Sequence, residues 1–337
     1  MREERKFSVT EPPHISSGET VPRAMLDTIL ALVPVTLVAI YFYRLNAVFL
    51  IGVCLLAAVV TDAVARKIKG RKPSVSDLSV LVTGLILALC FSPLTNWWTA
   101  VFATVLAVGI GKEWMGGLGW NRFNPAAFGR AGVIVLAPVT VFLNRQFAGW
   151  NVSFPMSPDV VDSVSGATPL TMIASPQMTL DVPHLQLLLA NPGGGGLAET
   201  SALALLLGGA YLLYRQHITW HIPVSILGAV AVLTTILGHN PADHLLTGGL
   251  MLGALFMATD WVTSPITDPG RIIFGVLIGV LVVVFRVFLG PTEGVAFAIL
   301  IMNAFVPLID RLTRRGVFGQ LNAAKAAAAK ATATKAA

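Results

Sequence analysis

Charged side chains are scarce in this sequence. Asp, Glu, Lys and Arg make up 12% of its 337 residues, about half of the ~25% that is usual in soluble domains. Hydrophobic residues make up 55%, the mean hydropathy is +0.75, and several apolar runs reach the ~20 residues that span a bilayer. This composition excludes an ordinary soluble domain and predicts an all-α, polytopic membrane protein.

Cysteine is also rare. Cys54 and Cys90 both fall within apolar runs, and the sequence contains no CxxC pair. An iron–sulfur cluster ligated by this chain alone is therefore excluded. The six histidines form no ligand cluster, since His217 and His221 simply flank Trp220, an arrangement common at membrane interfaces. We expect no metal site and no catalytic residue in this chain.

The positive net charge does not indicate nucleic-acid binding. The formal charge is +6, but the basic residues lie in short loops and tails and form no stripe interleaved with aromatic residues. Lys and Arg concentrate at 2–23, 66–72 and 311–315, whereas Arg44 and Arg145 belong to connections on the other side. By the positive-inside rule, both termini are cytoplasmic and the chain crosses a bacterial inner membrane, with lipid as its surroundings.

Ten membrane spans are predicted. They cover 24–43, 46–65, 78–95, 97–115, 123–143, 200–215, 221–238, 244–262, 271–289 and 294–312. They divide the chain into a cytoplasmic arm (1–23), a first five-helix repeat (24–143), a long periplasmic loop (144–199), a second five-helix repeat (200–312) and a basic, Ala-rich cytoplasmic tail (313–337). The loop is rich in proline and structurally ambiguous, since a loop of this length without periodicity is usually functional or disordered. We expect the glycine run 193–196 to be a flexible entry to the sixth span.

The two five-span groups share short markers in the same order. Tyr43-Arg44 recurs as Tyr214-Arg215, Thr83-Gly84 as Thr247-Gly248, and Glu113 with Asn124 as Glu293 with Asn303. Because each unit has an odd number of spans, the second copy must insert upside down. The sequence therefore predicts an inverted 5+5 repeat, as in many transporters.

The periplasmic loop contains the stretch Asp162-Ser163-Val164-Ser165-Gly166-Ala167-Thr168. Ser165-Gly166-Ala167-Thr168 resembles the motif on which a flavin transferase attaches FMN, although it also fits an ordinary Ser/Gly turn. Over residues 7–318 the chain is similar to the D subunits of Rnf complexes, which are ferredoxin:NAD⁺ oxidoreductases. It is also similar to the paralogous B subunits of sodium-pumping NADH:quinone reductases.

The resemblance implies a redox function. FMN would be joined through its phosphate to Thr168 by a separate flavin transferase that uses FAD, with Asp162 contacting that enzyme. A second, non-covalent flavin, expected to be riboflavin, would bind the same subunit. Electrons would pass between the ferredoxin/NAD side and periplasmic carriers, among them a second periplasmic flavoprotein subunit, coupled to Na⁺ or H⁺ translocation. The short N-terminal arm favours Rnf over the quinone reductase.

Polar residues at two span ends are candidates for the second flavin site. Asn121 and Asn124 lie where the chain enters the fifth span, and Asp260 lies where it leaves the eighth, both on the predicted cytoplasmic side. Amides and carboxylates at membrane depth are costly without partners and are functional candidates. The alternative is structural, with Asn124-Pro125 breaking a helix and Asp260 capping a loop.

Three further charged residues lie near these span ends. Arg130 falls inside the fifth span and is expected to pair with Glu113 or Asp260. A contact with the flavin phosphate is less expected, because Thr168 lies on the opposite side. Lys112 and Glu113 fit interfacial residues that extend to water.

A rival function is a passive channel or secondary transporter for a small neutral solute or ammonium. Inverted repeats with Thr-Gly pairs near the midplane suit such a pore. The Thr168 motif separates the two hypotheses, since a solute channel has no use for it.

Overall fold

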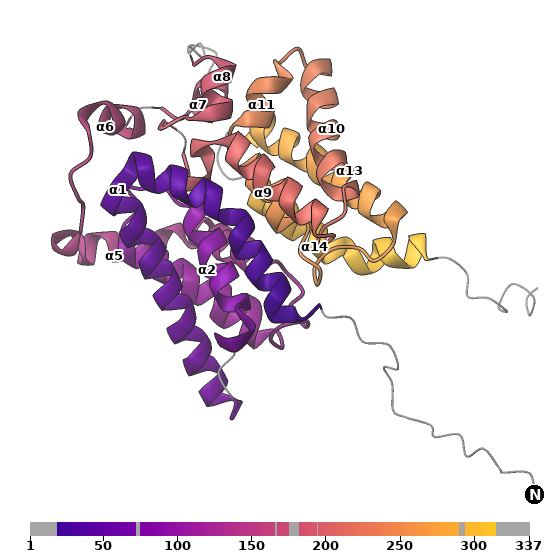
Figure 1. Cartoon of the computed structure of the whole chain (residues 1–337), viewed down its shortest axis with the longest axis horizontal. Coiled ribbons are helices and arrows are strands. Elements are labelled where there is room, and N and C mark those ends of the chain that lie inside the picture. Colours follow the sequence, from indigo (N-terminus) through magenta and orange to yellow (C-terminus); the bar gives the residue numbers. More distant parts are fainter. Residues whose placement is uncertain are drawn as a thin grey trace, which may run out of the picture.

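The computed structural model describes residues 19–71, 75–165, 167–174, 182–193, 195–289 and 294–314, and this part of the chain is helical without strands. Figure 1 shows the N-terminal helices α1, α2 and α5 gathered on one side and α9, α10, α13 and α14 on the other, with α6, α7 and α8 along one edge.

The helices follow one another in chain order, several of them continuing directly into π-helical segments. They are α1 (Val21–Ile68), α2 (Ser79–Leu89), α3 (Trp97–Thr104) with η2 (Val105–Trp114), α4 (Pro125–Val135), α5 (Ala137–Gln146), α6 (Pro158–Ser165), α7 (Pro169–Ala174), α8 (His184–Leu189), α9 (Ala202–Tyr214), α10 (His221–Ile236), α11 (Pro241–Leu246), α12 (Leu250–Leu252) with η5 (Gly253–Met257), α13 (Asp268–Val284) with η6 (Phe285–Leu289), and α14 (Gly294–Thr313). A short 3₁₀ turn, η4 (Leu197–Thr200), precedes α9.

The first two predicted spans form the two halves of α1. The backbone of Arg44 leaves the helical region, with φ 48° and ψ −125°, so the helix breaks there. In Figure 1 the two halves run in different directions on either side of this break. Leu37 and Leu56, one on each half, are 60% and 67% exposed. Such outward-facing leucines suit a lipid-facing surface.

Several helices have the length and composition to cross a membrane. Among the described residues these are α1, α13 continued by η6, and α14; α4 and α5 together make a fourth, bent by 76°. Shorter apolar helices, α2, α9 and α10, complete the bundle. The features of an all-helical, multi-pass membrane protein are therefore confirmed, while several predicted spans are shorter or broken.

The sequence left the connection 144–199 structurally ambiguous, and its described part is partly helical. It contains α6, α7 and α8. Pro158 and Pro169 are the first residues of α6 and α7, and Pro183 is the N-cap of α8. Proline is well suited to a helix start, because its fixed φ is helical and its missing N–H has no partner there anyway. These three prolines therefore mark the starts of short helices.

Close helix packing gives a first testable prediction. A Cβ atom on Gly208 of α9 would collide with the carbonyl oxygen of Ala31 on α1 and approach the Phe256 ring to 3.0 Å. Gly208→Ala is expected to destabilise the protein by about 1–3 kcal/mol, because α9 must move off α1. Gly228→Ala on α10, where nothing lies within 4 Å, should be neutral or gain about 0.5–1 kcal/mol. Thermal unfolding of the purified protein in detergent measures both, and equal stabilities would contradict the α1–α9 contact.

Candidate functional site

Two cavities lie among the helices. The first, of about 270 Å³, is lined by residues that include Asn121, Asn124 and Asp260, and is called the amide cavity. The second, of about 260 Å³, is lined by residues that include Thr168, and is called the threonine cavity. Both are bordered by α2, α4 and the α12–η5 segment. All the predicted flavin positions whose side chains the structure describes, apart from Ala167, therefore line one of two cavities.

Asn124 has a structural role at the amide cavity. It is the N-cap of α4, where its Oδ1 accepts the Ala127 N–H at 3.0 Å. Its Nδ2 donates to the Met257 carbonyl at 3.0 Å, and its own N–H donates to Asn303 Oδ1 at 3.1 Å. The interpretation as a helix break is confirmed, and the same side chain joins α4 to η5. Asn124 thus fixes one wall of the cavity.

Asp260 and Asn121 form the adjacent part of this wall. The Asp260 carboxylate accepts the Thr263 hydroxyl at 3.1 Å and also accepts hydrogen bonds from the Asn121 amide and from the N–H groups of Trp261 and Val262. Capping of the following turn, one of the two alternatives for Asp260, is therefore confirmed. The carboxylate and the Asn121 amide still border the cavity, and apolar residues make up much of the rest.

Lys112 and Glu113 do not extend to water, so that prediction is wrong. They are 2% and 1% exposed. Lys112 Nζ donates to Ser79 Oγ at 2.7 Å and lies 3.9 Å from Asp62, and Arg66 bridges Asp62 and Glu113 at 3.3 Å each. The α1 side chains supply the partners that buried charges need. Lys112 also lines the amide cavity.

A second polar cluster, which the sequence reasoning missed, is centred on Asp27 of α1. Its carboxylate accepts hydrogen bonds from the Tyr211 hydroxyl at 2.9 Å and the Arg215 Nε at 2.9 Å, and its Oδ2 lies 2.6 Å from His217 Nε2. His217 lines the amide cavity. An acidic residue within an apolar span was the available signal.

The two histidines considered earlier do not act as a pair. His221 stacks on Trp220 at 4.2 Å, while His217 contacts Asp27. Ligand atoms of Glu19, Asp27 and His217 lie within 4.8 Å of one another. Arg215 already pairs with Asp27 at 2.9 Å and with Glu19 at 3.6 Å, so its guanidinium already supplies a positive charge to both carboxylates.

Thr168 borders the threonine cavity at the start of α7. Its Oγ1 lies 3.2 Å from Thr171 Oγ1 and accepts the Thr171 N–H at 3.3 Å, as expected of a helix cap. Ala167, beside it, is half-buried. Of the other motif residues, Asp162 and Ser165 belong to α6 without described side chains, and Gly166 lies outside the described residues. The Thr168 hydroxyl is therefore held at a cavity by the start of a helix.

Arg130 is not where we expected it. It lines the threonine cavity together with Thr168 and Glu199, whereas Glu113 contacts Arg66 and Asp260 borders the amide cavity. The Arg130 guanidinium lies 4.9 Å from the centre of the Phe91 ring. The expectation that Thr168 and Arg130 lie on opposite sides is wrong, because α4 ends at Val135 and the Thr168 segment packs in towards its middle.

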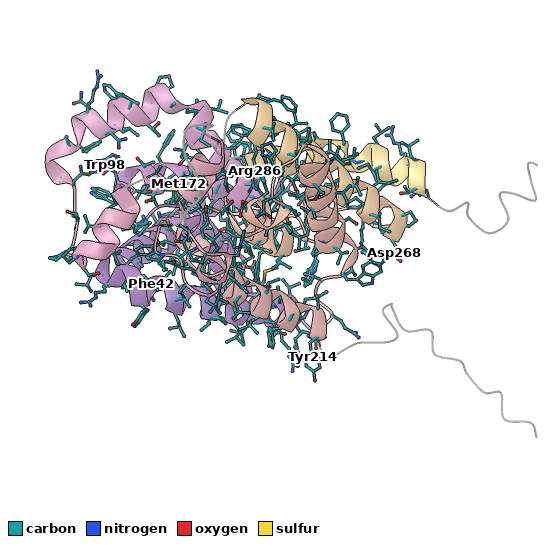
Figure 2. The ribbon with its side chains drawn as sticks, turned by 90° about the horizontal axis from the view of Figure 1, so that it is seen from above. Phe42, Trp98, Met172, Tyr214, Asp268 and Arg286 are labelled. Carbon is teal, nitrogen blue, oxygen red and sulfur yellow. The ribbon has the colours of Figure 1, made fainter. Side chains whose placement is uncertain are left out.

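The chain leaves the helical conformation at Thr247-Gly248-Gly249, between α11 and α12, on the wall of the threonine cavity. Arg286 donates to the carbonyls of Thr247 at 2.9 Å and Gly248 at 3.1 Å, and Glu199 accepts the Gly248 N–H at 2.9 Å. In Figure 2 Arg286 lies among the ribbons, while Tyr214 lies at the periphery. Irregular backbone at membrane depth requires such protein partners. Neither Glu199 nor Arg286 was singled out from the sequence.

Glu199 is positioned by the glycine run, which we expected to be a flexible connector. The Gly196 N–H donates to Glu199 Oε1 at 3.3 Å, and a Cβ on Gly196 would come within 3.1 Å of the Leu89 carbonyl. A larger residue here would press against the end of α2, so the glycine allows close packing. Burial raises the pKa of the Glu199 carboxyl, and the N–H donors of Gly248, Gly195 and Gly196 oppose that rise.

Comparison with known families gives a match over nearly the whole chain. The family model described as NQR2, RnfD, RnfE matches residues 8–319. The matched segment contains both cavities and the Thr168 motif.

Individual relatives agree with this match. The chain is 36% identical to the D subunit of the Na(+)-translocating ferredoxin:NAD(+) oxidoreductase complex of Acetobacterium woodii, covering 94% of this chain and 96% of the relative. It is 36% identical to the D subunit of the proton-translocating ferredoxin:NAD(+) oxidoreductase complex of Clostridium ljungdahlii, covering 93% and 96%. It is 38% identical to the D subunit of the ion-translocating oxidoreductase complex of Stutzerimonas stutzeri, covering 89% and 93%.

Proposed function

The chain belongs to the NQR2, RnfD, RnfE family, and from this premise we propose that it is the D-type flavoprotein subunit of an Rnf complex. It would carry electrons between the ferredoxin/NAD side and periplasmic carriers, coupled to Na⁺ or H⁺ translocation, alongside the other Rnf subunits and a second periplasmic flavoprotein subunit. The observation that carries the proposal is the position of Thr168. The motif threonine borders a cavity with charged groups on its walls, as a tethered cofactor requires.

FMN attachment at Thr168 needs an external enzyme. The hydroxyl's hydrogen-bond partners in the described structure are groups of Thr171, which cannot take up a proton at neutral pH. A flavin transferase would remove the hydroxyl proton while Oγ1 attacks the FMN-side phosphorus of FAD. The new bond is Oγ1–P, the pyrophosphate bond breaks, and AMP leaves.

The amide cavity fits a second, non-covalent flavin, proposed to be riboflavin. Its walls combine apolar residues with the Asn121 and Asn124 amides, the Asp260 carboxylate and buried Lys112. Small-molecule sites are mostly apolar with a few placed polar groups that fix orientation. The flavin would supply one- and two-electron chemistry, and these side chains would hold its polar edge. A second carrier is needed because one site cannot bridge ~30 Å of hydrocarbon.

The proposed topology is ten spans in an inverted 5+5 repeat within the inner membrane, with cytoplasmic termini and Thr168 on the periplasmic side. Local geometry supports the repeat. The predicted counterparts Asn124 and Asn303 are hydrogen-bonded to each other, as residues near a pseudo-two-fold axis can be.

Two alternatives remain distinguishable from this proposal. The B subunit of a Na⁺-translocating NADH:quinone reductase would share the fold and both flavins. The two hypotheses are distinguished by identifying the subunits with which the chain co-purifies. A small-solute channel would share the repeat without the covalent flavin. The flavin therefore tests the proposal against the channel.

The direct test is to produce the full chain with and without a flavin transferase. We expect the denatured polypeptide to fluoresce under ultraviolet light only when the transferase is present, and its intact mass to rise by one FMN ester. The transferase-free sample is the control for tightly bound free flavin. A mass equal to that of the unmodified chain in both samples would refute covalent attachment and favour the channel.

A further inference from the structure

The threonine cavity has opposite charges on its walls. Arg130 comes from α4 and Glu199 from η4, and both are partly accessible because they face the cavity. Leu89, Leu252 and Val295 contribute apolar walls from three other segments. Ionisable side chains at membrane depth are costly and as a rule serve a function. Such a cavity suits a ligand that has a flat, largely apolar ring and a polar edge.

Thr168 lies close to these charged groups. A Cβ placed on Gly195 would come within 3.5 Å of Thr168 Cγ2 and within 3.5 Å of Glu199 Oε1. The threonine and the carboxylate therefore both lie close to a single glycine. A group joined to Thr168 through a phosphate and a ribityl chain can reach the far wall of the cavity without any rearrangement of the main chain.

From this juxtaposition we infer that the threonine cavity is the docking site for the ring of the flavin tethered at Thr168, and that Arg130 is the residue that positions this ring and stabilises its reduced form. The inference rests on the proposed function, because it requires FMN on Thr168. It adds a binding cavity and a charged residue that the attachment motif does not indicate.

Arg130 suits this role by charge and by orientation. Reduction of a flavin places negative charge at the N1–C2 carbonyl edge of the ring, and a nearby cation favours that form. Inside a water-poor cavity, the interaction is much stronger than it would be at an exposed site. Packing against the Phe91 ring at 4.9 Å holds the guanidinium in place through a cation–π contact.

A purely structural role for Arg130 predicts a different outcome. If the guanidinium served only to pack on Phe91, its replacement would lower stability while the potential of the flavin stayed the same. Stability and redox potential are therefore measured separately. The potential is the measurement that a structural role leaves unchanged.

The first experiment uses the unaltered full chain, produced with the transferase and purified in detergent. Quenching of the flavin fluorescence by iodide is measured on the native protein and again after denaturation. The signal of the covalent flavin is obtained by subtracting that of a Thr168→Val sample. A docked ring is expected to be shielded from iodide until the chain is denatured. Equal quenching in both states would place the ring in solvent and overturn the docking site.

The second experiment compares Arg130→Gln, Arg130→Lys and, as matched control, Arg145→Gln on the exposed surface of α5. Spectroelectrochemical titration identifies the covalent flavin as the wave that is missing from Thr168→Val. We expect a more negative midpoint potential in Arg130→Gln, a smaller shift in Arg130→Lys and none in Arg145→Gln. Gel fluorescence should show full attachment in all three.

The outcomes separate this inference from the proposed function. An unaltered chain that carries no covalent FMN refutes the proposed function itself. Covalent FMN with an unshifted potential in Arg130→Gln refutes the role of Arg130. Should Arg130→Gln fail to fold, Arg130→Lys and the iodide measurement on the unaltered chain still decide the question.

Discussion

Thr168→Val is expected to remove covalent flavin from the chain completely. Valine keeps the size and branching of threonine but has no hydroxyl to form the phosphoester. The loss should therefore be of the bond itself and not a partial change in affinity. In-gel fluorescence of the denatured polypeptide should vanish, and the intact mass should equal that of the unmodified chain.

The controls for this substitution are neighbouring hydroxyls. Ser163→Ala and Thr171→Val should retain full fluorescence, since neither occupies the acceptor position. Thr171 is the stricter control, because both its N–H and its hydroxyl are within hydrogen-bond distance of Thr168 Oγ1. Loss of the Thr168 cap is expected to cost about 1 kcal/mol of local stability, too little to unfold a bundle. Fluorescence retained in Thr168→Val would mean that another residue carries the flavin.

The sequence was sufficient for the fold class and for the grouping of Asn121, Asn124 and Asp260. Composition and run length alone indicate a helical membrane protein. The three polar residues could be grouped because each lies at an end of an apolar span, and span ends on one side of a membrane lie near one another. Their hydrogen bonds were also partly foreseeable, since Asn before Pro at a helix start is a common cap.

The buried charges could not be placed from the sequence. Lys112 was read as interfacial because a lysine near a span end usually reaches water. Its actual partners, Ser79 and Asp62, lie 33 and 50 residues earlier in the chain, on α2 and α1. Spacing along one segment carries no information about such partners. Burial here is decided by which carboxylates the neighbouring helices present.

The position of Arg130 was missed for a geometric reason. Treating the fifth span as one straight helix places Arg130 near the cytoplasmic end, far from the Thr168 loop. In the structure α4 ends at Val135 and α5 turns away by 76°, so the connection after α5 folds back and Thr168 borders the same cavity as Arg130. A broken span lets the following loop pack deeper among the helices than a hydropathy profile indicates, because that profile contains no bend.

Asn121→Leu is expected to release the non-covalent flavin while leaving the covalent one in place. Leucine has nearly the branched shape of asparagine but cannot hydrogen-bond, so a bound flavin would lose a polar partner and Asp260 would lose the amide that donates to it. Leaving buried polar groups unpaired costs about 1–3 kcal/mol. Since a 1.4 kcal/mol difference is about tenfold in affinity, riboflavin binding should weaken roughly 5- to 150-fold.

The measurement for Asn121→Leu is the amount of riboflavin released per chain on denaturation, with gel fluorescence reporting the covalent FMN. Thr28→Val is the matched control, because Thr28 lines the same cavity but already donates its hydroxyl to the Ala24 carbonyl at 2.9 Å. It should keep its riboflavin. Unaltered protein that releases none would show that the amide cavity holds something other than flavin, and equal loss in both variants would trace the effect to the fold and not to the Asn121 amide.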